Sequence, residues 1–387
     1  MNLRGAWLCG AVLFLEGYDI AAVGYAVPSL VDAWKVRPQV FTGVLTAGNI
    51  GLLVGSVCAG VPGDRLGRKP VLIACTVVFG VFSLLSALAG SPSQLAGLRF
   101  LTGLGLGGGI PIAIALASDL APAIIQGRLM ILIGAGVPIG FAAGGLLASR
   151  LVGPLGWPAI FVTGGVLPIA LVPLLVLWLP RSVGVRAAAH GHNLVAALFQ
   201  NGLAPTTVLL WAINLFSLLA VYFILQWTPA ILHSAGVSPA RAILGTTMYS
   251  LGVIVCPLVA APIVDRLGME RVLTCGLTFG AFCVLSIGLF DPRFWLLAIV
   301  LFGAGIGGGC QAGINSLSAL AYPATIRSTG AGWALGAGRI GTIAGPLSGG
   351  VLMTAGFSAQ KVFIAAAFPV FAAAVSMVIL GRLRRSA

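Results

Sequence analysis

Charge is scarce in this 387-residue chain, since Asp, Glu, Lys and Arg together make up only 7% of it. Soluble domains carry about 25% charged residues, whereas 59% of this sequence is hydrophobic. The shortage excludes a soluble enzyme or a soluble binding module and predicts a membrane protein with many spans. Each span needs about 20 residues, so a dozen spans would occupy nearly the whole chain. We therefore expect no soluble catalytic domain and no enzyme activity.

Acidic residues are scarcer than basic ones, 8 against 21, and the net charge is +13. A concentrated basic surface would indicate a nucleic-acid partner, but these residues are distributed between the apolar runs. Thirteen fall on the side of the two termini, six fall on the other side, and Arg99 and Arg339 lie within spans. This is the positive-inside asymmetry of membrane proteins. It predicts a lipid bilayer around the chain, both termini in the cytoplasm and no nucleic-acid partner.

Motifs for metals and cofactors are missing as well. The seven cysteines contain no C-x-x-C pair, and His190 and His192 would supply only two of the four usual ligands of a metal site. The run from Gly103 to Gly109 lacks the preceding strand and the Lys-Ser/Thr of a phosphate-binding loop. Its small-x-x-x-small spacing is typical of closely packed membrane helices instead. We predict no metal, no disulfide framework and no cofactor.

Long apolar runs are abundant, and each is long enough to cross a bilayer as a helix. The twelve predicted spans are 6–31, 41–62, 71–90, 94–118, 128–149, 157–180, 203–232, 241–262, 272–290, 294–320, 328–354 and 359–381. The longest polar connection, 181–202, separates six spans in 1–180 from six spans in 203–387. The prediction is an all-α membrane protein of two six-helix bundles joined by a cytoplasmic linker.

The two halves repeat each other's sequence. The loop stretch 63–67, Gly-Asp-Arg-Leu-Gly, follows the second span, and 264–268, Val-Asp-Arg-Leu-Gly, follows the eighth at an offset of 201. The glycines of 103–109 recur in 303–309 at an offset of 200, so we expect the bundles to be pseudo-symmetric. Acids and arginines at such loops can pair with a helix end or a neighbouring bundle and hold one conformation; the alternative is a turn flanked by positive-inside charges. We call this set the predicted latch, and its members are Asp64, Arg65, Arg68, Asp265 and Arg266.

Four charged residues inside the spans break this symmetry. Glu16 and Asp19 share one face of the first span, and Arg99 and Arg339 lie in the fourth and eleventh spans. A charge in the hydrocarbon costs roughly 2.5 kcal/mol or more, so such residues usually mark the path of an ion or substrate. An arginine can hold an organic carboxylate bidentately, and a carboxyl group that loses an arginine neighbour gains proton affinity. The set predicts coupling between an anionic substrate and a proton; the alternative is a structural set of buried ion pairs, with Arg99 snorkelling to the interface.

Polar and aromatic residues in the second half are expected to line the substrate cavity. Aromatic walls with few polar groups suit a flat, partly apolar ligand. Trp and Tyr near span ends also act as interface anchors, which is the alternative for the aromatic members. The predicted lining residues are Tyr222, Gln226, Gln311, Asn315 and Trp333.

Four stretches resemble the aromatic acid–proton symporters of the major facilitator superfamily. They are Glu16-Gly17-Tyr18-Asp19 in the first span, Arg99-Phe100-Leu101-Thr102-Gly103 in the fourth, Leu210-Trp211 with Tyr222 and Trp227-Thr228-Pro229 in the seventh, and Tyr322-Pro323 followed by Gly338-Arg339-Ile340-Gly341 in the tenth and eleventh. The resemblance implies a twelve-helix secondary transporter that imports benzoate-, hydroxybenzoate- or phenylpropionate-like acids together with protons. It implies proton coupling at Asp19 and Glu16, and substrate binding or gating at Arg99 and Arg339. We expect a monomer in the inner membrane of a bacterium.

An antiporter that exports drugs or metabolites against protons is the alternative on the same fold. Antiporters typically carry Gly-Pro-x-x-Gly-Gly in the fifth span, where this chain has Val137-Pro138-Ile139-Gly140. The similar run from Gly345 to Gly350 lies in the eleventh span instead. A sensor built on a transporter scaffold is a further alternative, which a long soluble tail would favour.

Overall fold

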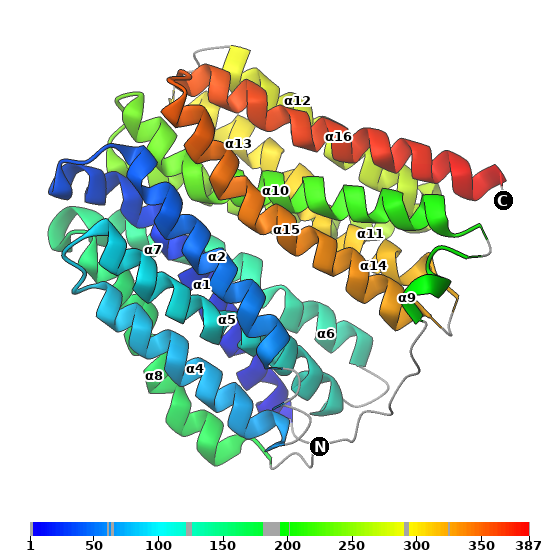
Figure 1. The fold of residues 1–387 in the computed structure, drawn as a ribbon, viewed down its shortest axis with the longest axis horizontal. Coiled ribbons are helices and arrows are strands. Elements are labelled where there is room, and N and C mark those ends of the chain that lie inside the picture. Colours follow the sequence, from blue (N-terminus) through cyan, green and yellow to red (C-terminus); the bar gives the residue numbers. More distant parts are fainter. Residues whose placement is uncertain are drawn as a thin grey trace. The chain divides into compact units, whose positions relative to one another are not determined.

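The computed structural model describes residues 3–59, 62, 66–120, 126–180, 194–200, 202–289, 294–323 and 326–386. Within these ranges the regular elements are helices, and no strand occurs (Figure 1). The elements are α1 (Leu3–Trp34), η1 (Pro38–Phe41), α2 (Thr42–Cys58), α4 (Arg68–Ser86), α5 (Pro92–Leu120), α6 (Gln126–Gly134), α7 (Gly136–Leu155), α8 (Pro158–Trp178), α9 (Leu194–Ala197), α10 (Ala204–Ser234), α11 (Pro239–Leu267), α12 (Met269–Leu289), α13 (Phe294–Gly309), α14 (Gln311–Leu320), α15 (Arg327–Thr354) and α16 (Ala359–Ser386).

Eleven helical stretches in the described part are long and apolar enough to span a membrane, judged by length and composition. The helix of the predicted eleventh span, α15, is not among them, because its sequence is rich in glycine and contains Arg339. Its 28 residues nevertheless exceed the length that a bilayer requires. The predicted all-α membrane fold is confirmed.

Two of the predicted spans are interrupted rather than continuous. The span predicted at 128–149 is formed by α6 and α7, which meet at Ala135, and that predicted at 294–320 is formed by α13 and α14, which meet at Cys310. Glycines precede both breaks, and glycine favours the helix less than most residues do. Hydropathy alone conceals such breaks, because the apolar run continues across them.

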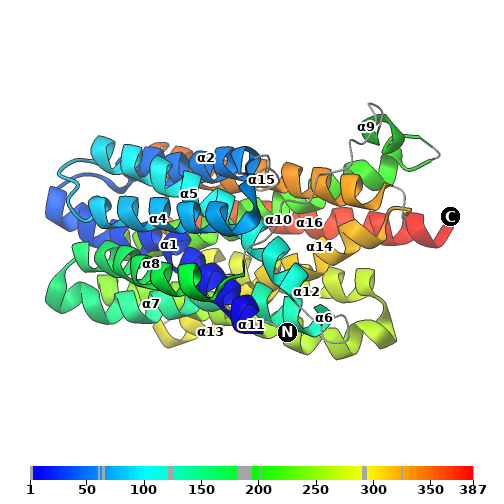
Figure 2. The ribbon, with the colours of Figure 1, turned by 90° about the horizontal axis from the view of Figure 1, so that it is seen from below.

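The described contacts divide the chain into two compact units. The first contains Met1–Ala188 and Leu232–Thr247, and the second contains Ala189–Ile231 and Met248–Ala387. The end of α10 and the start of α11 therefore belong to the first unit, although they lie in the second half of the sequence. Within the first unit, α1, α4, α7 and α8 run side by side (Figure 2). The predicted linker, 181–202, lies largely outside the described residues, so the predicted boundary stays a prediction.

The duplicated glycine stretches bring helices into close contact in both units. In the first unit, a Cβ atom on Gly103 of α5 would overlap the carbonyl oxygen of Gly48 in α2. In the second unit, a Cβ atom on Gly305 of α13 would overlap the carbonyl oxygen of Tyr249 in α11. Glycine is what permits backbones to approach this closely. The predicted packing role of these stretches is confirmed.

Candidate functional site

Asp19 of α1 and Arg99 of α5 form an ion pair inside the first unit. Arg99 Nη1 lies 3.1 Å from Asp19 Oδ2, and the two side chains are 2% and 0% exposed. The hydroxyl of Ser83 on α4 donates to the other carboxylate oxygen, Oδ1, at 2.5 Å. Three helices therefore meet at the Asp19 carboxylate. A residue predicted for proton coupling and a residue predicted for substrate binding or gating are direct partners.

Further polar contacts fix the Arg99 guanidinium. Its Nε and Nη2 atoms donate to Ser86 Oγ at 3.1 and 2.9 Å, and Nη2 also donates to Thr102 Oγ1 at 2.7 Å. The ring of Phe161 on α8 lies 5.0 Å from the guanidinium carbon, within the range of a cation–π interaction. These contacts hold Arg99 inside the unit and exclude snorkelling to the interface.

Sequence reasoning missed the hydroxyl partners of this pair. Ser83 and Ser86 are three residues apart in the third span, so they share one helix face. Two small polar residues at helical spacing in an apolar span are a signal that could have been used. Their partner could not have been read in this way, because helical spacing does not show which other span the face meets.

Glu16 lies one turn before Asp19 on α1 and is fully buried. Its carboxylate packs over α5, where a Cβ atom on Gly109 would overlap Oε1. The thiols of Cys9 and Cys75 are close enough to interact electrostatically with it. Glu16 and Asp19 thus share the face of α1 that meets α5, as their spacing predicted, and Asp19 is the one that forms the ion pair with Arg99.

In the second unit, an amide network joins α10 to α14. The side-chain Nδ2 of Asn214 donates to the carbonyl oxygen of Leu210 at 2.9 Å and to Ser318 Oγ at 3.1 Å. The Nε2 of Gln311 donates to Asn214 Oδ1 at 3.1 Å and to Asn315 Oδ1 at 2.8 Å. The structure therefore brings the predicted residues Gln311 and Asn315 together, with Asn214 at the centre of the network.

Arg339 is half-buried in α15, and its charge acts on the buried Tyr222 of α10. Four ion pairs join side chains that the structure describes, and none of them includes Arg339. Gln226 is buried one turn beyond Tyr222. Trp333, two turns before Arg339, stacks on Trp211 with 5.7 Å between ring centroids and remains 45% exposed. These residues place an aromatic surface, amide groups and a cation that has no acidic partner among the described side chains in one unit.

The predicted latch is only partly visible. Asp64 and Arg65 lie outside the described residues. Arg68, at the start of α4, forms an ion pair with Asp119 at the end of α5 and donates to the Ala115 carbonyl oxygen at 3.1 Å. The remaining members, Asp265 and Arg266, are exposed at the end of α11.

Comparison with known proteins identifies a family match that extends over nearly the whole chain. The profile of the Major Facilitator Superfamily matches residues 9–238 and 210–387. Solved structures with the same fold include the nucleoside transporter NupG, with a TM-score of 0.77, 16% identity and coverage of 98% of this chain and 99% of that chain. The D-xylose-proton symporter has a TM-score of 0.77 at 17% identity, covering 96% and 97%. At these identities the likeness shows the fold alone.

Curated relatives of this chain are transporters named for aromatic acids. The chain is 32% identical to the gallate transporter of Pseudomonas putida, and the match covers 97% of this chain and 91% of the relative. It is 31% identical to the 4-hydroxybenzoate transporter PcaK of Pseudomonas putida, covering 98% and 92%. It is 33% identical to the 3-(3-hydroxy-phenyl)propionate transporter of Escherichia coli (strain K12), covering 96% and 92%.

Proposed function

This chain belongs to the Major Facilitator Superfamily, and we propose that it imports small aromatic carboxylates together with protons. It is a transporter and not an enzyme. The buried ion pair of Asp19 and Arg99 carries the proposal of proton coupling. Charged side chains within a membrane are costly and usually line the path of an ion or substrate. The names of the relatives, gallate, 4-hydroxybenzoate and 3-(3-hydroxy-phenyl)propionate transporters, support the substrate class.

Coupling follows from the charge balance of the pair. While Arg99 contacts Asp19, the two charges compensate each other in a site that excludes water. A proton on Asp19 removes the negative partner of Arg99 and leaves a buried cation that favours an anion. Conversely, an anion that engages Arg99 leaves Asp19 without compensation and favours its protonation. Proton and carboxylate thus each promote binding of the other, as reciprocal linkage requires.

We assign the first contact with the substrate carboxylate to Arg339, before the anion engages Arg99. A guanidinium holds a carboxylate through two parallel N–H···O bonds. Among the described side chains, no acidic residue forms an ion pair with Arg339. The exposed face of Trp333 suits an aromatic ring, since offset stacking is favourable. The amide groups of Gln311 and Asn315 suit ring substituents that form hydrogen bonds.

The distribution of basic residues supports an orientation with both termini in the cytoplasm. Arg4 lies at the start of α1, and Arg68 and Lys69 lie at the start of α4. The Lys69 ammonium donates to the Val176 carbonyl oxygen at 2.7 Å, at the end of α8, where a cation complements the helix dipole. We place the protein in the inner membrane of a bacterium, as a monomer.

Uptake into proteoliposomes tests this function. Labelled 4-hydroxybenzoate, gallate and 3-(3-hydroxyphenyl)propionate are offered with an inward proton gradient, and wild type is compared with Asp19→Asn. We expect the wild type to accumulate at least one of these acids when the gradient is imposed. Asp19→Asn should lose gradient-driven accumulation, because the amide cannot take up the proton.

Glu270→Gln is the matched control, since it removes a carboxylate from the partly exposed ion pair with Arg384. It should accumulate substrate as the wild type does. Uptake that ignores the gradient and Asp19 would contradict symport. Expulsion of substrate driven by the same gradient would favour the antiporter instead.

A further inference from the structure

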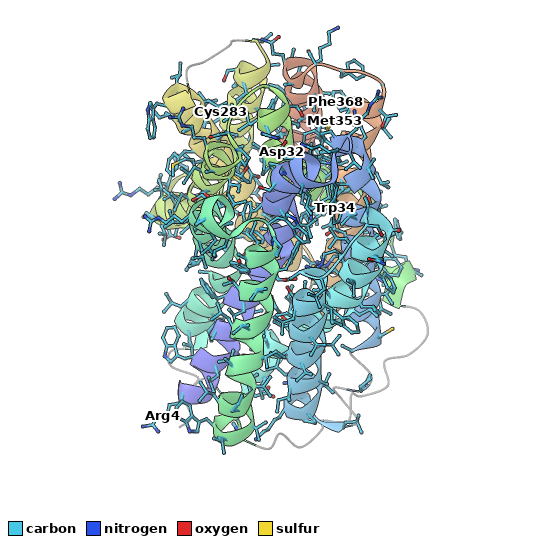
Figure 3. All side chains as sticks on the ribbon, turned by 90° about the vertical axis from the view of Figure 1, so that its left-hand side faces the viewer. Arg4, Asp32, Trp34, Cys283, Met353 and Phe368 are labelled. Carbon is cyan, nitrogen blue, oxygen red and sulfur yellow. The ribbon has the colours of Figure 1, made fainter. Side chains whose placement is uncertain are left out.

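A second acid–base contact joins α1 to the end of α10. His233 Nε2 lies 3.0 Å from Asp32 Oδ1, and both residues belong to the first compact unit. In sequence they come from different halves of the chain, Asp32 from 1–180 and His233 from 203–387. Figure 3 shows Asp32 at one end of α1 and Arg4 at the other. The orientation proposed above therefore places this pair on the outer face of the membrane.

Both polar partners of His233 are acceptors, so both hydrogen bonds form only when each ring nitrogen carries a proton. Its Nδ1 lies 3.0 Å from the carbonyl oxygen of Val237, which can only accept. Its Nε2 faces a carboxylate oxygen of Asp32, which also only accepts when ionised. A neutral imidazole has one N–H and can make one of these bonds, whereas the imidazolium makes both. If the proton lies on the Asp32 carboxyl group instead of on the ring, the pair of His233 and Asp32 still holds the same total number of protons.

Asp32 supplies the acidic group at this position. The end of α1, the connection to η1, the end of α7 and the start of α11 otherwise carry basic residues, namely Lys35, Arg37, Arg150 and Arg241. In the part of the chain that the structure describes, His233 forms no ion pair other than that with Asp32. The Asp32 side chain is 57% exposed and that of His233 is 20% exposed. Water and protons therefore reach this pair, whereas Asp19 is enclosed.

We propose that His233 and Asp32 form a second proton-binding site, which holds the outer ends of α1 and α10 together when protonated and releases them when deprotonated. The inference rests on the proposed function, because it uses the proposed orientation and the motion of a transporter. Imidazoles change charge between about pH 5 and 8. Asp19 and Asp32 both lie on α1, separated by about 20 Å of helix. A movement of this helix therefore displaces both proton sites.

The pair acts on conformation more than on stability. Exposed ion pairs contribute little to folding, but a transporter alternates between states of similar free energy, and a small bias shifts their populations. We expect the protonated pair to change the ratio of closed to open outer faces by about two- to fivefold. A loss of this size is measurable in a transport rate.

The first experiment reads the protons on the ring and needs no substrate. The chain has three histidines, so protein labelled with nitrogen-15 histidine in lipid nanodiscs gives few signals, and His233→Gln identifies the one from His233. In the acidic sample we expect protons on both ring nitrogens, since both of their partners accept hydrogen bonds. At alkaline pH we expect a neutral ring with its proton on Nδ1, because Val237 accepts from it. A neutral ring protonated on Nε2 instead would overturn the proposal, whatever the substrate proves to be.

The second experiment measures substrate exchange between equal concentrations and equal pH on both sides, so that no gradient contributes. At about pH 5.5, His233→Gln and Asp32→Asn should each exchange about two- to fivefold faster than the wild type, and at about pH 8 all three should agree. The double variant should be no faster than either single variant, because both remove one interaction. Lys35→Gln, an exposed charge at the same end of α1, is the control that should keep the wild-type profile. Equal rates for wild type and His233→Gln at acidic pH, or additive effects in the double variant, would overturn the proposal.

Absence of aromatic acid transport would remove the proposed function but leave the nanodisc experiment to decide on the proton site. If the acids are transported but the neutral ring of His233 is protonated on Nε2, the proposed function stands and the proposed proton site is overturned. The two failures are therefore distinguishable.

Discussion

The two arginines within the spans lie in opposite environments. In the first unit, Arg99 is 2% exposed and is bound by Asp19, Ser86 and Thr102. In the second unit, Arg339 is half-buried beside Tyr222 and takes no part in the ion pairs of the described residues. One cation is compensated within the protein, whereas the other has no acidic partner among the described side chains.

This difference indicates that the two duplicated halves have different functions. Both units keep a close glycine contact between matching helices, Gly103 of α5 against α2 and Gly305 of α13 against α11, although the sequence offset of 200 pairs Gly103 with Gly303. The repeat therefore preserves the packing of these helices. The charges are not repeated, because a buried charge constrains function rather than helix packing. We infer that the second unit makes the first contact with the anion, and that the first unit couples the anion to the proton through Arg99 and Asp19.

The largest effect is expected from breaking the compensated pair. Arg99→Leu leaves the Asp19 carboxylate buried without its counter-charge, and removing one partner of a buried pair costs about 3–5 kcal/mol of unfolding free energy. The double variant Asp19→Asn/Arg99→Leu should recover part of this loss, because no charge remains buried. Reversible unfolding in mixed micelles measures both.

Arg339→Leu is the comparison for this prediction. Since Arg339 has no acidic partner in the described part of the chain, its removal should cost less than about 1 kcal/mol, as for exposed charges. Equal losses of stability in Arg99→Leu and Arg339→Leu would show that the two environments do not differ as the structure indicates.

Arg339 should contribute little to stability but strongly to substrate affinity. Arg339→Gln removes hydrogen bonds to a charged group, which are worth about 1.5–3 kcal/mol, so the dissociation constant should rise roughly ten- to hundredfold. Arg339→Lys should fall between, because an ammonium keeps the charge without the bidentate geometry. Titration calorimetry with an aromatic acid measures this, and an unchanged constant in Arg339→Gln would remove Arg339 from the binding site.

The fold follows from the sequence because its determinants are local. Apolar runs of the right length predict membrane helices, and the small-x-x-x-small spacing of 103–109 predicts close helix packing. The breaks at Ala135 and Cys310 were not predicted, since hydropathy averages over the glycines that cause them. The helix boundaries that we predicted from the short polar connections differ from the observed ones by a few residues.

The site follows from the sequence only in its composition. The shared face of Glu16 and Asp19 comes from helical spacing and is local. The pairing of Asp19 with Arg99, 80 residues away, depends on how α1 packs on α5, which spacing does not encode. The same applies to Asn214, whose partners Gln311 and Ser318 come from another helix.

Alanine substitutions test whether the helices pack equally closely in the two units, although the units differ in their charged residues. Gly103→Ala and Gly305→Ala each place a Cβ atom against a backbone carbonyl, and such overpacking costs typically about 1–3 kcal/mol. The two losses should be similar if the repeat preserves packing in both units. Gly332→Ala is the control, because a Cβ atom there meets nothing within 4 Å, and alanine favours the helix. A loss confined to one of the two positions in an unfolding experiment would break the equivalence.

The smallest effect is expected from an ion pair of similar chemistry at the surface. Arg68 and Asp119 pair as Arg99 and Asp19 do, but their side chains are 23% and 50% exposed. Water compensates a charge that remains when its partner is removed, so Asp119→Asn should cost less than about 1 kcal/mol of unfolding free energy. Salt should reduce this contribution, since exposed charges are screened at about 10 Å in 0.1 M salt, and should leave the cost of Arg99→Leu nearly unchanged. Unfolding measured at low and high ionic strength separates the two pairs, and a salt-independent loss of several kcal/mol in Asp119→Asn would show that burial does not account for the difference between them.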